Sequence, residues 1–233
     1  MSKEKLELYR NIGRRTLTAT SSIGLLGVLL FVSAGRLDWM RAWFYLGLTM
    51  TGMLINFVVL VSTNPEVIAA RGKNQVVGTK WFDKVFVMIS LPLGVAIFVV
   101  AGLESGRWGG DLGPIVAGVG ILMLCLANIP ILSSLVVNRH LEKTVRIQSE
   151  RDHQVVTAGP YQWVRHPMYV GMILQQFGCP LLLGSRWALI PAALASLAFV
   201  VRTALEDQTL QDELPGYTEF TQQTKYRLFP GIW

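Results

Sequence analysis

A thirteen-residue segment, Gly159 to Gly171, gathers the residues of this chain that are best suited to bind a ligand. It reads GPYQWVRHPMYVG and directly precedes a long apolar run. The residue before a proline favours extended backbone, and a proline suits the first turn of a helix. We therefore expect Arg165 and His166 to be extended and Pro167 to begin a helix. Because free N–H groups at a helix start attract anions, a cation and an imidazole there suggest a binding site. A structural role is the alternative: Arg165 reaching lipid head groups and His166 capping the helix.

A second candidate group follows near the end of the last apolar run. Arg202 and Glu206 are four residues apart, which makes them neighbours on one face of a helix, and Asp207 is adjacent. Such a pair could be an ordinary surface ion pair, worth a few tenths of a kcal/mol. Acidic residues close to a membrane span are nevertheless costly and often functional. A carboxylate here could bind an ammonium group or a ribose hydroxyl of a ligand.

The composition is that of an integral membrane protein. Of the 233 residues 52% are hydrophobic and only 15% are charged, against about 25% charged in typical globular proteins. The mean hydropathy is +0.43, and several runs approach the roughly 20 apolar residues that cross a bilayer. The net charge of +6 does not indicate nucleic acid, because the basic residues border apolar runs and suit a membrane surface. Cys125 and Cys179 lie inside apolar runs, and no metal-ligand cluster is present, so we expect neither a disulfide nor a metal site.

We predict an all-α fold with about six transmembrane helices, at residues 16–35, 42–62, 85–103, 112–137, 167–184 and 187–205. The last two runs are short and form a helical hairpin, and whether 187–205 crosses fully is left open. Residues 1–15 form an interfacial arm, and a short amphipathic helix begins at Pro65 with Asn64 as its cap. The tail, residues 206–233, is expected to be an amphipathic helix on the membrane, or alternatively a lid over the hairpin.

The distribution of basic residues predicts the orientation. If all six runs cross, only four of the 21 lysines and arginines fall on one side, namely Arg36, Arg41, Arg107 and Arg186. Cytoplasmic loops carry the excess of positive charge, so both termini are expected in the cytoplasm. The polar segments with candidate site residues then share that face.

Four motifs in order resemble a known family: Gly159-Pro160-Tyr161 with Arg165-His166-Pro167-x-Tyr169-x-Gly171, Arg202-x-x-x-Glu206-Asp207, Gly216-Tyr217-x-x-Phe220 and Arg227-x-x-Pro230. The set resembles the C-terminal half of the isoprenylcysteine carboxyl methyltransferase family and its bacterial membrane relatives. The loop from Asn64 to Asp83 also looks like the bacterial branch. We accordingly divide the chain into an arm with four transmembrane helices (1–137) and a methyltransferase-like core (138–233).

The resemblance implies an enzyme that uses S-adenosylmethionine. It assigns cofactor contacts to Tyr161, Arg165, His166, Pro167, Tyr169, Gly171, Glu206 and Asp207. Asp207 departs from the commoner pair of glutamates and has a shorter reach. The same resemblance places Arg202 near the methyl acceptor as the catalytic residue, and the acceptor could also be bound by Arg139, Arg146 and Arg227.

The resemblance implies a lipophilic, prenylcysteine-like carboxylate as the methyl acceptor. The residues agree with it, because no nucleophile–base pair is evident and a carboxylate is already ionised at pH 7. An amine acceptor would need a base, for which Glu206 or His166 is the candidate. A phospholipid amine, a small thiol, a reductase using NADPH similar to the sterol reductases, and a non-enzymatic membrane scaffold are the alternatives. Membrane lipids and a lipophilic or lipidated substrate are the expected partners.

Overall fold

The computed structural model describes residues 3–72 and 78–233, and every regular element within these ranges is a helix, as predicted. The eight α-helices are α1 (Lys3–Ala34), α2 (Met40–Thr63), α3 (Pro65–Arg71), α4 (Trp81–Leu103), α5 (Gly113–Val137), α6 (Pro167–Leu183), α7 (Leu189–Glu213) and α8 (Tyr217–Gln223). A π-helical turn, η1 (Glu104–Trp108), and two 3-10 turns, η2 (Ser149–Arg151) and η3 (Gly159–Gln162), complete the set. Residues 1–2 of the expected arm and residues 73–77 of the loop after α3 lie outside the described residues.

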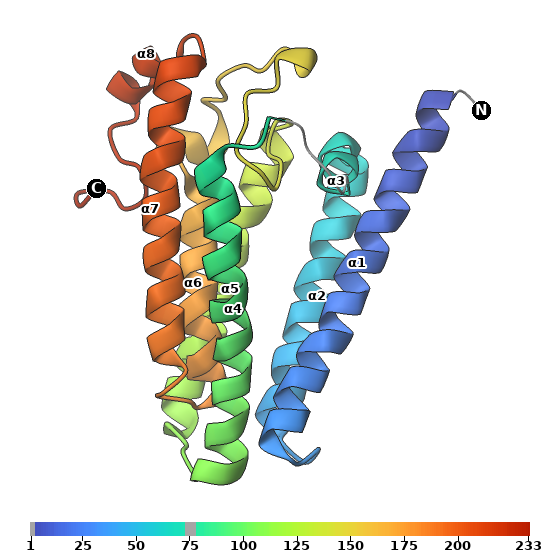
Figure 1. The fold of residues 1–233 in the computed structure, drawn as a ribbon, viewed down its shortest axis with the longest axis vertical. Coiled ribbons are helices and arrows are strands. Elements are labelled where there is room, and N and C mark those ends of the chain that lie inside the picture. The colour runs from blue at the N-terminus through green and yellow to red at the C-terminus, as the bar shows by residue number, and fades with distance from the viewer. Residues whose placement is uncertain (1–2, 73–77) are drawn as a thin grey trace.

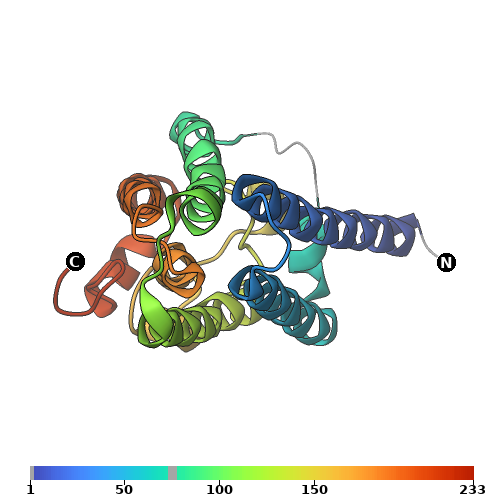
Figure 2. The same cartoon turned by 90° about the horizontal axis from the view of Figure 1, so that it is seen from below.

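The six long helices run roughly along one axis, and the short elements gather at one end of the bundle (Figure 1). The N-terminus, α3, α8 and the long connection between α5 and α6 all lie at that end, which we call the α8 end. The view along the axis shows α4, α5, α6 and α7 grouped together, with α1 and α2 beside them (Figure 2). This arrangement brings the polar segments of the sequence to a single face, as the counting of basic residues predicted.

Five of the described helices are long and apolar enough to cross a membrane: Tyr9–Ala34, Met40–Thr63, Trp81–Trp108, Gly113–Val137 and Leu189–Glu213. The sixth predicted run is the helix Pro167–Leu183, which is apolar but has only 17 residues. Its length of about 25 Å falls short of the roughly 30 Å hydrocarbon core. The chain is a multi-pass membrane protein.

Two helices extend beyond the apolar runs that predicted them. Helix α1 is continuous from Lys3, so the expected arm is the first part of the first transmembrane helix. Helix α7 continues to Glu213 and does not end near residue 205. Hydropathy detects only the apolar part of a helix, whereas glutamate, glutamine and leucine after residue 205 are good helix formers. Glu206 and Asp207 are therefore held on a rigid helix.

The short helix α3 begins at Pro65 as predicted, but the role expected for Asn64 is wrong. The side chain of Asn64 makes no capping hydrogen bond. Its amide donates to the carbonyls of Leu135 (3.0 Å) and Val136 (3.4 Å) at the end of α5. Asn64 is thus a link between helices, because the exposed carbonyls of a helix end need donors.

Helices α5 and α6 have the most extensive contact in the bundle. A side chain at Gly120 would collide with the backbone of Leu182, and one at Gly171 would collide with the carbonyl of Ala127. Small residues let membrane helices approach closely, which strengthens dispersion contacts and fixes their relative position. The start of α6, where the candidate site residues lie, is therefore anchored to α5.

The tail packs on the protein through a short helix, α8, and the segment that follows it. Tyr217 and Phe220 of α8 are buried in a cluster with Tyr161 and Leu214. The amide N–H groups of Arg165 and His166 then donate to the carbonyls of residues 226 and 227, at 2.9 and 3.0 Å. The pairing holds this segment against the tail, but the prediction of extended backbone before Pro167 is wrong: Arg165 lies in a bend, and His166 has φ −126° and ψ 60°.

Candidate functional site

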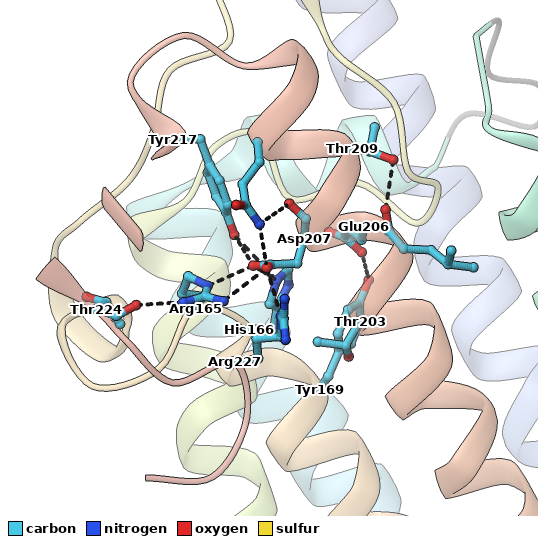
Figure 3. Close-up of polar contacts among 12 residues, drawn as sticks. Arg165, His166, Tyr169, Thr203, Glu206, Asp207, Thr209, Tyr217, Thr224 and Arg227 are labelled. Atoms are coloured by element: carbon cyan, nitrogen blue, oxygen red, sulfur yellow. Dashed lines mark hydrogen bonds and ion pairs between the residues drawn. The ribbon is translucent and has the colours of Figure 1, made fainter. Parts of the chain in front are cut away.

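The carboxylate of Asp207 is the centre of a buried polar network at the α8 end (Figure 3). Asp207 is fully buried. Its two oxygens accept hydrogen bonds from Arg165 Nε (2.7 Å), Arg165 Nη2 (3.0 Å), Arg227 Nε (2.8 Å), Tyr217 Oη (3.0 Å) and Gln211 Nε2 (2.9 Å), and His166 Nε2 lies 3.2 Å away. Burying a carboxylate is expensive unless charged donors satisfy it, and here two guanidinium groups do so. Asp207 therefore joins α7 to α6, α8 and the tail.

Arg165 is committed to the same network. Its Nη1 donates to the carbonyls of Thr224 (2.9 Å) and Lys225 (2.8 Å), so its three nitrogens all have partners. Burial, and then the charge of Asp207, raise the pKa of Tyr217, whose neutral hydroxyl can donate to that carboxylate. These residues hold the tail against the start of α6.

A second group of side chains on α6 and α7 lies beside the Asp207 network and includes His166, Tyr169 and Glu206. The rings of His166 and Tyr169 lie parallel, with centroids 5.8 Å apart and an interplanar angle of 2°. The Tyr169 hydroxyl donates to Glu206 Oε2 at 2.5 Å, while the second oxygen of the half-buried Glu206 has no recorded partner in the part of the chain that is described. Glu206 thus offers a carboxylate oxygen on a rigid helix.

Arg202 lies one turn before Glu206 and is also buried. Its Nη2 is 2.7 Å from Asp83 Oδ1 and donates to the carbonyl of Lys143 at 3.0 Å. The guanidinium stacks over the ring of Phe86 (4.5 Å to the centroid) and lies 5.2 Å from the centroid of Tyr169. Asp83 was missed as a site residue, although the segment containing it was part of the family resemblance. Asp83 and Arg202 are 119 positions apart in the sequence, so no local sequence pattern indicates that they form a pair.

A cavity that is partly open to solvent lies between these side chains and the α5–α6 connection. Eight predicted site residues line it: Arg146, Tyr161, Arg165, His166, Pro167, Tyr169, Arg202 and Glu206. Four do not. Gly171 packs on α5, and Asp207 and Arg227 belong to the buried network. Arg139 is not part of the lining, but its Nε donates to Nε2 of His140, which is.

The α5–α6 connection supplies cavity residues that sequence reasoning did not single out. The rings of His140 and His153 lie in contact, with centroids 4.6 Å apart and an interplanar angle of 32°. Gln148 is buried, and its amide donates to the His140 carbonyl. Burial and neighbouring charges lower the pKa of His153 to about 4, and burial, then Arg139, lower that of His140. Both imidazoles are therefore neutral at pH 7.

Arg146 is paired with acidic residues of the same connection. Arg146 holds Glu142 through two hydrogen bonds of 2.9 and 3.0 Å and contacts Glu150 at 2.6 Å. These hydrogen bonds raise the pKa of Arg146. Because Glu142 and Glu150 already occupy the guanidinium of Arg146, this residue forms part of the cavity wall and is not free to bind an anion.

Several polar atoms of the lining lack a partner. Five buried side-chain polar atoms in the described ranges have no hydrogen bond, and three of them belong to cavity residues: His140 Nδ1, Thr144 Oγ1 and Arg202 Nε. Buried polar groups are normally satisfied, so these three atoms are available to polar atoms of a ligand in the cavity. The cavity offers them together with the free oxygen of Glu206.

Comparison with known protein families finds one family that the region around the cavity resembles. Residues 120–212 match the isoprenylcysteine carboxyl methyltransferase family, and they include α6 and most of α7 with the lining residues Tyr169, Arg202 and Glu206. The match covers less than half of the chain, and the matched region supplies both helices that frame the cavity.

Two relatives extend this result. The cobalt-zinc-cadmium resistance protein CzcN of Cupriavidus metallidurans is 31% identical over 147 residues, which are 59% of this chain and 61% of CzcN. The eukaryotic intramembrane Ras methyltransferase ICMT has a similar structure, with a TM-score of 0.55, 18% identity, and coverage of 92% of this chain and 75% of that chain. At that identity, the likeness shows a shared fold.

Proposed function

We propose that this protein transfers the methyl group of S-adenosylmethionine to a lipophilic acceptor at the cytoplasmic face of a membrane. The observation that carries the proposal is the cavity at the α8 end, which lies in the region that matches the family and has unsatisfied polar atoms in its wall. The fold shared with a membrane methyltransferase supports it further.

The residues of the cavity fit the cofactor chemically. S-adenosylmethionine carries an ammonium group, a carboxylate, ribose hydroxyls and a purine, and when bound it supplies a methyl group activated by a sulfonium. The free oxygen of Glu206 suits the ammonium group or a ribose hydroxyl. His140 Nδ1 and the Thr144 hydroxyl can pair with polar atoms of the cofactor, and the rings of His166 and Tyr169 provide flat apolar surface.

The side chains then act by positioning. Methyl transfer is an in-line displacement, so orientation of the acceptor and exclusion of water can lower most of the barrier. Arg202 is held by Asp83 and two aromatic rings, and its unpaired Nε can orient an acceptor oxygen. Asp207 and Arg165 are positioning residues in this proposal, because their hydrogen bonds are used within the protein.

The geometry also favours one acceptor class. His166 Nε2 lies 3.2 Å from Asp207 Oδ1 and 3.4 Å from the Tyr217 hydroxyl, so this nitrogen already has partners within the protein. One oxygen of Glu206 already accepts a hydrogen bond from Tyr169. A prenylcysteine-like carboxylate, which is ionised at pH 7 and needs no base, therefore fits better than an amine.

The proposal predicts selective cofactor binding. Calorimetry on the purified protein should detect S-adenosylhomocysteine and no NADPH; NADPH binding alone would instead favour the reductase. Incubation with radiolabelled S-adenosylmethionine and a membrane lipid extract should then label a lipid, and the label should be released by base if it is a methyl ester. A base-stable label would identify an amine or thiol acceptor.

The orientation is tested separately. We propose that the α8 end and both termini face the cytoplasm, because most lysines and arginines lie at that end. A reporter that is active only in the cytoplasm should work when fused after Trp233 and fail when inserted next to Arg186 in the α6–α7 turn. The reverse pattern would contradict the orientation.

A further inference from the structure

Three basic residues from separate elements approach one another beside the cavity. Arg71 is the last residue of α3, and its Nη1 donates to the carbonyls of Leu141 (3.2 Å) and Glu142 (3.4 Å). Lys143 is the next residue along that connection, and its side chain is exposed. Arg71 and Lys143 therefore belong to one surface at the α8 end.

The third residue, Arg15, comes from α1. Helix α1 packs on α3 closely enough that a side chain at Gly72 would collide with the carbonyl of Asn11. Arg15 is one turn after Asn11 and on the same face of α1. Burial lowers the pKa of Arg71 to about 10 and lowers that of Lys143, and in both cases the positive charge of Arg15 lowers it further. The three charges are thus close enough to repel one another.

Acidic side chains do not balance this cluster. Carboxylates nearby are used elsewhere: Glu142 pairs with Arg146, Glu66 with Arg151, and Asp83 with Arg202. Among the described residues, Arg15, Arg71 and Lys143 have no ion pair with a carboxylate. Like charges brought together without a counterion are unfavourable, so an anion would stabilise this arrangement.

The depth of Arg15 indicates the kind of anion. The candidate span Tyr9–Ala34 has 26 residues and is about 39 Å long, which exceeds the roughly 30 Å hydrocarbon core. Arg15 lies about 9 Å from its start, close to the boundary between lipid head groups and acyl chains. Basic pockets between transmembrane helices at this level bind acidic head groups.

The cluster is also connected to the cavity. Arg71 Nη1 lies 3.9 Å from Met168 Sδ, and Met168, Leu141 and Glu142 all line the cavity. Lys143 accepts a hydrogen bond from Arg202 through its carbonyl. A lipid head group bound by the cluster would therefore lie next to the cavity wall that faces α3.

We propose that Arg15, Arg71 and Lys143 bind the anionic head group, a carboxylate or a phosphate, of a membrane lipid whose chains lie along α1. Binding of this lipid does not depend on the proposed methyl transfer. Only a role of the bound lipid as the methyl acceptor would rest on the proposed function. The cluster was not among the predicted substrate residues, because its three members are separated by 56 and 72 positions in the sequence.

The proposal is tested by lipid binding to the purified full-length protein in neutral detergent. Native mass spectrometry with added phosphatidylglycerol, oleate or phosphatidylcholine should show binding at least tenfold tighter for the two anionic lipids. Arg15→Gln and Lys143→Gln should each weaken anionic binding about tenfold and leave phosphatidylcholine unchanged. Arg14→Gln, an exposed neighbour on the same helix, is the matched control and should bind as wild type.

The other outcomes overturn the proposal. Equal loss in Arg14→Gln would mean that total charge and not this cluster attracts lipid. Unchanged binding in Lys143→Gln, whose exposed side chain can be replaced without unfolding, would exclude the cluster directly. Inorganic phosphate that competes at the same concentration as phosphatidylglycerol would assign the site to a soluble anion. Calorimetry with S-adenosylhomocysteine on the same samples separates this test from the proposed function, because Lys143→Gln should bind the cofactor product normally.

Discussion

Arg165 and Asp207 form a bidentate ion pair, 2.7 and 3.0 Å long, between the residue two positions before α6 and the middle of the polar part of α7. The pair is buried and shares Asp207 with a second guanidinium from Arg227. Neither group of the Arg165–Asp207 pair is free to react. Its effect is to fix the start of α6 and the tail against the polar part of α7, where Glu206, the neighbour of Asp207, lines the cavity.

Removal of the Asp207 charge should destabilise the protein. Asp207→Asn leaves the buried Arg165 without its counterion, which typically costs about 3–5 kcal/mol. We expect a clear decrease in the thermal unfolding midpoint in detergent. Asp212→Asn, on an exposed part of the same helix, is the control and should unfold as wild type. Equal midpoints for both variants would show that the buried network does not hold the tail.

Replacement of Glu206 should instead affect the cofactor. Glu206→Gln keeps the shape and the acceptor for Tyr169 but removes the charge, so binding of S-adenosylhomocysteine should weaken about 10- to 100-fold, the value of a charge-assisted hydrogen bond. The unfolding midpoint should change little. Glu213→Gln, which removes a surface ion pair with Lys80, should bind normally. Full binding by Glu206→Gln would remove Glu206 from the cofactor site.

Arg202 and Asp83 can be separated by a double variant. Arg202→Met should leave the buried Asp83 unpaired and destabilise the protein by about 3 kcal/mol, while also abolishing methyl transfer. Asp83→Asn combined with Arg202→Met removes both charges and should restore most of the stability. Methyl transfer should remain lost. Its recovery in the double variant would assign Arg202 a purely structural role.

The histidine pair predicts a pH dependence of stability. The pKa of His153 is about 4 in the folded protein, against about 6.5 in an unfolded chain, so the unfolded state binds the proton more readily between these values. This contribution to stability is complete above pH 6.5 and is lost as the pH falls toward 4. His153→Phe keeps a ring on His140 and cannot titrate. The unfolding midpoint of wild type should therefore fall more steeply than that of His153→Phe between pH 7 and 5; parallel curves would contradict a neutral buried His153.

Local rules were sufficient for a good part of this protein. Hydropathy located the long helices because an apolar run of about 20 residues is recognisable by itself, and the position of Pro167 predicted the start of α6. The same rules failed at the helix ends. Hydropathy does not see the polar turns that continue α7 to Glu213, nor the tertiary contact that turns Asn64 away from capping α3.

The sequence by itself determined that the chain is a helical membrane protein, where its motifs lie, and that Glu206 and Arg202 share a helical face. Only the tertiary structure decided which charges are already used. Asp207 and Arg165 satisfy each other across 42 positions, and Asp83 holds Arg202 across 119. Arg15, Arg71 and Lys143 have no ion pair with a carboxylate in the described part of the chain. Spacing along the chain carries no information about such pairs, because their free energy depends on burial and on distances set by helix packing.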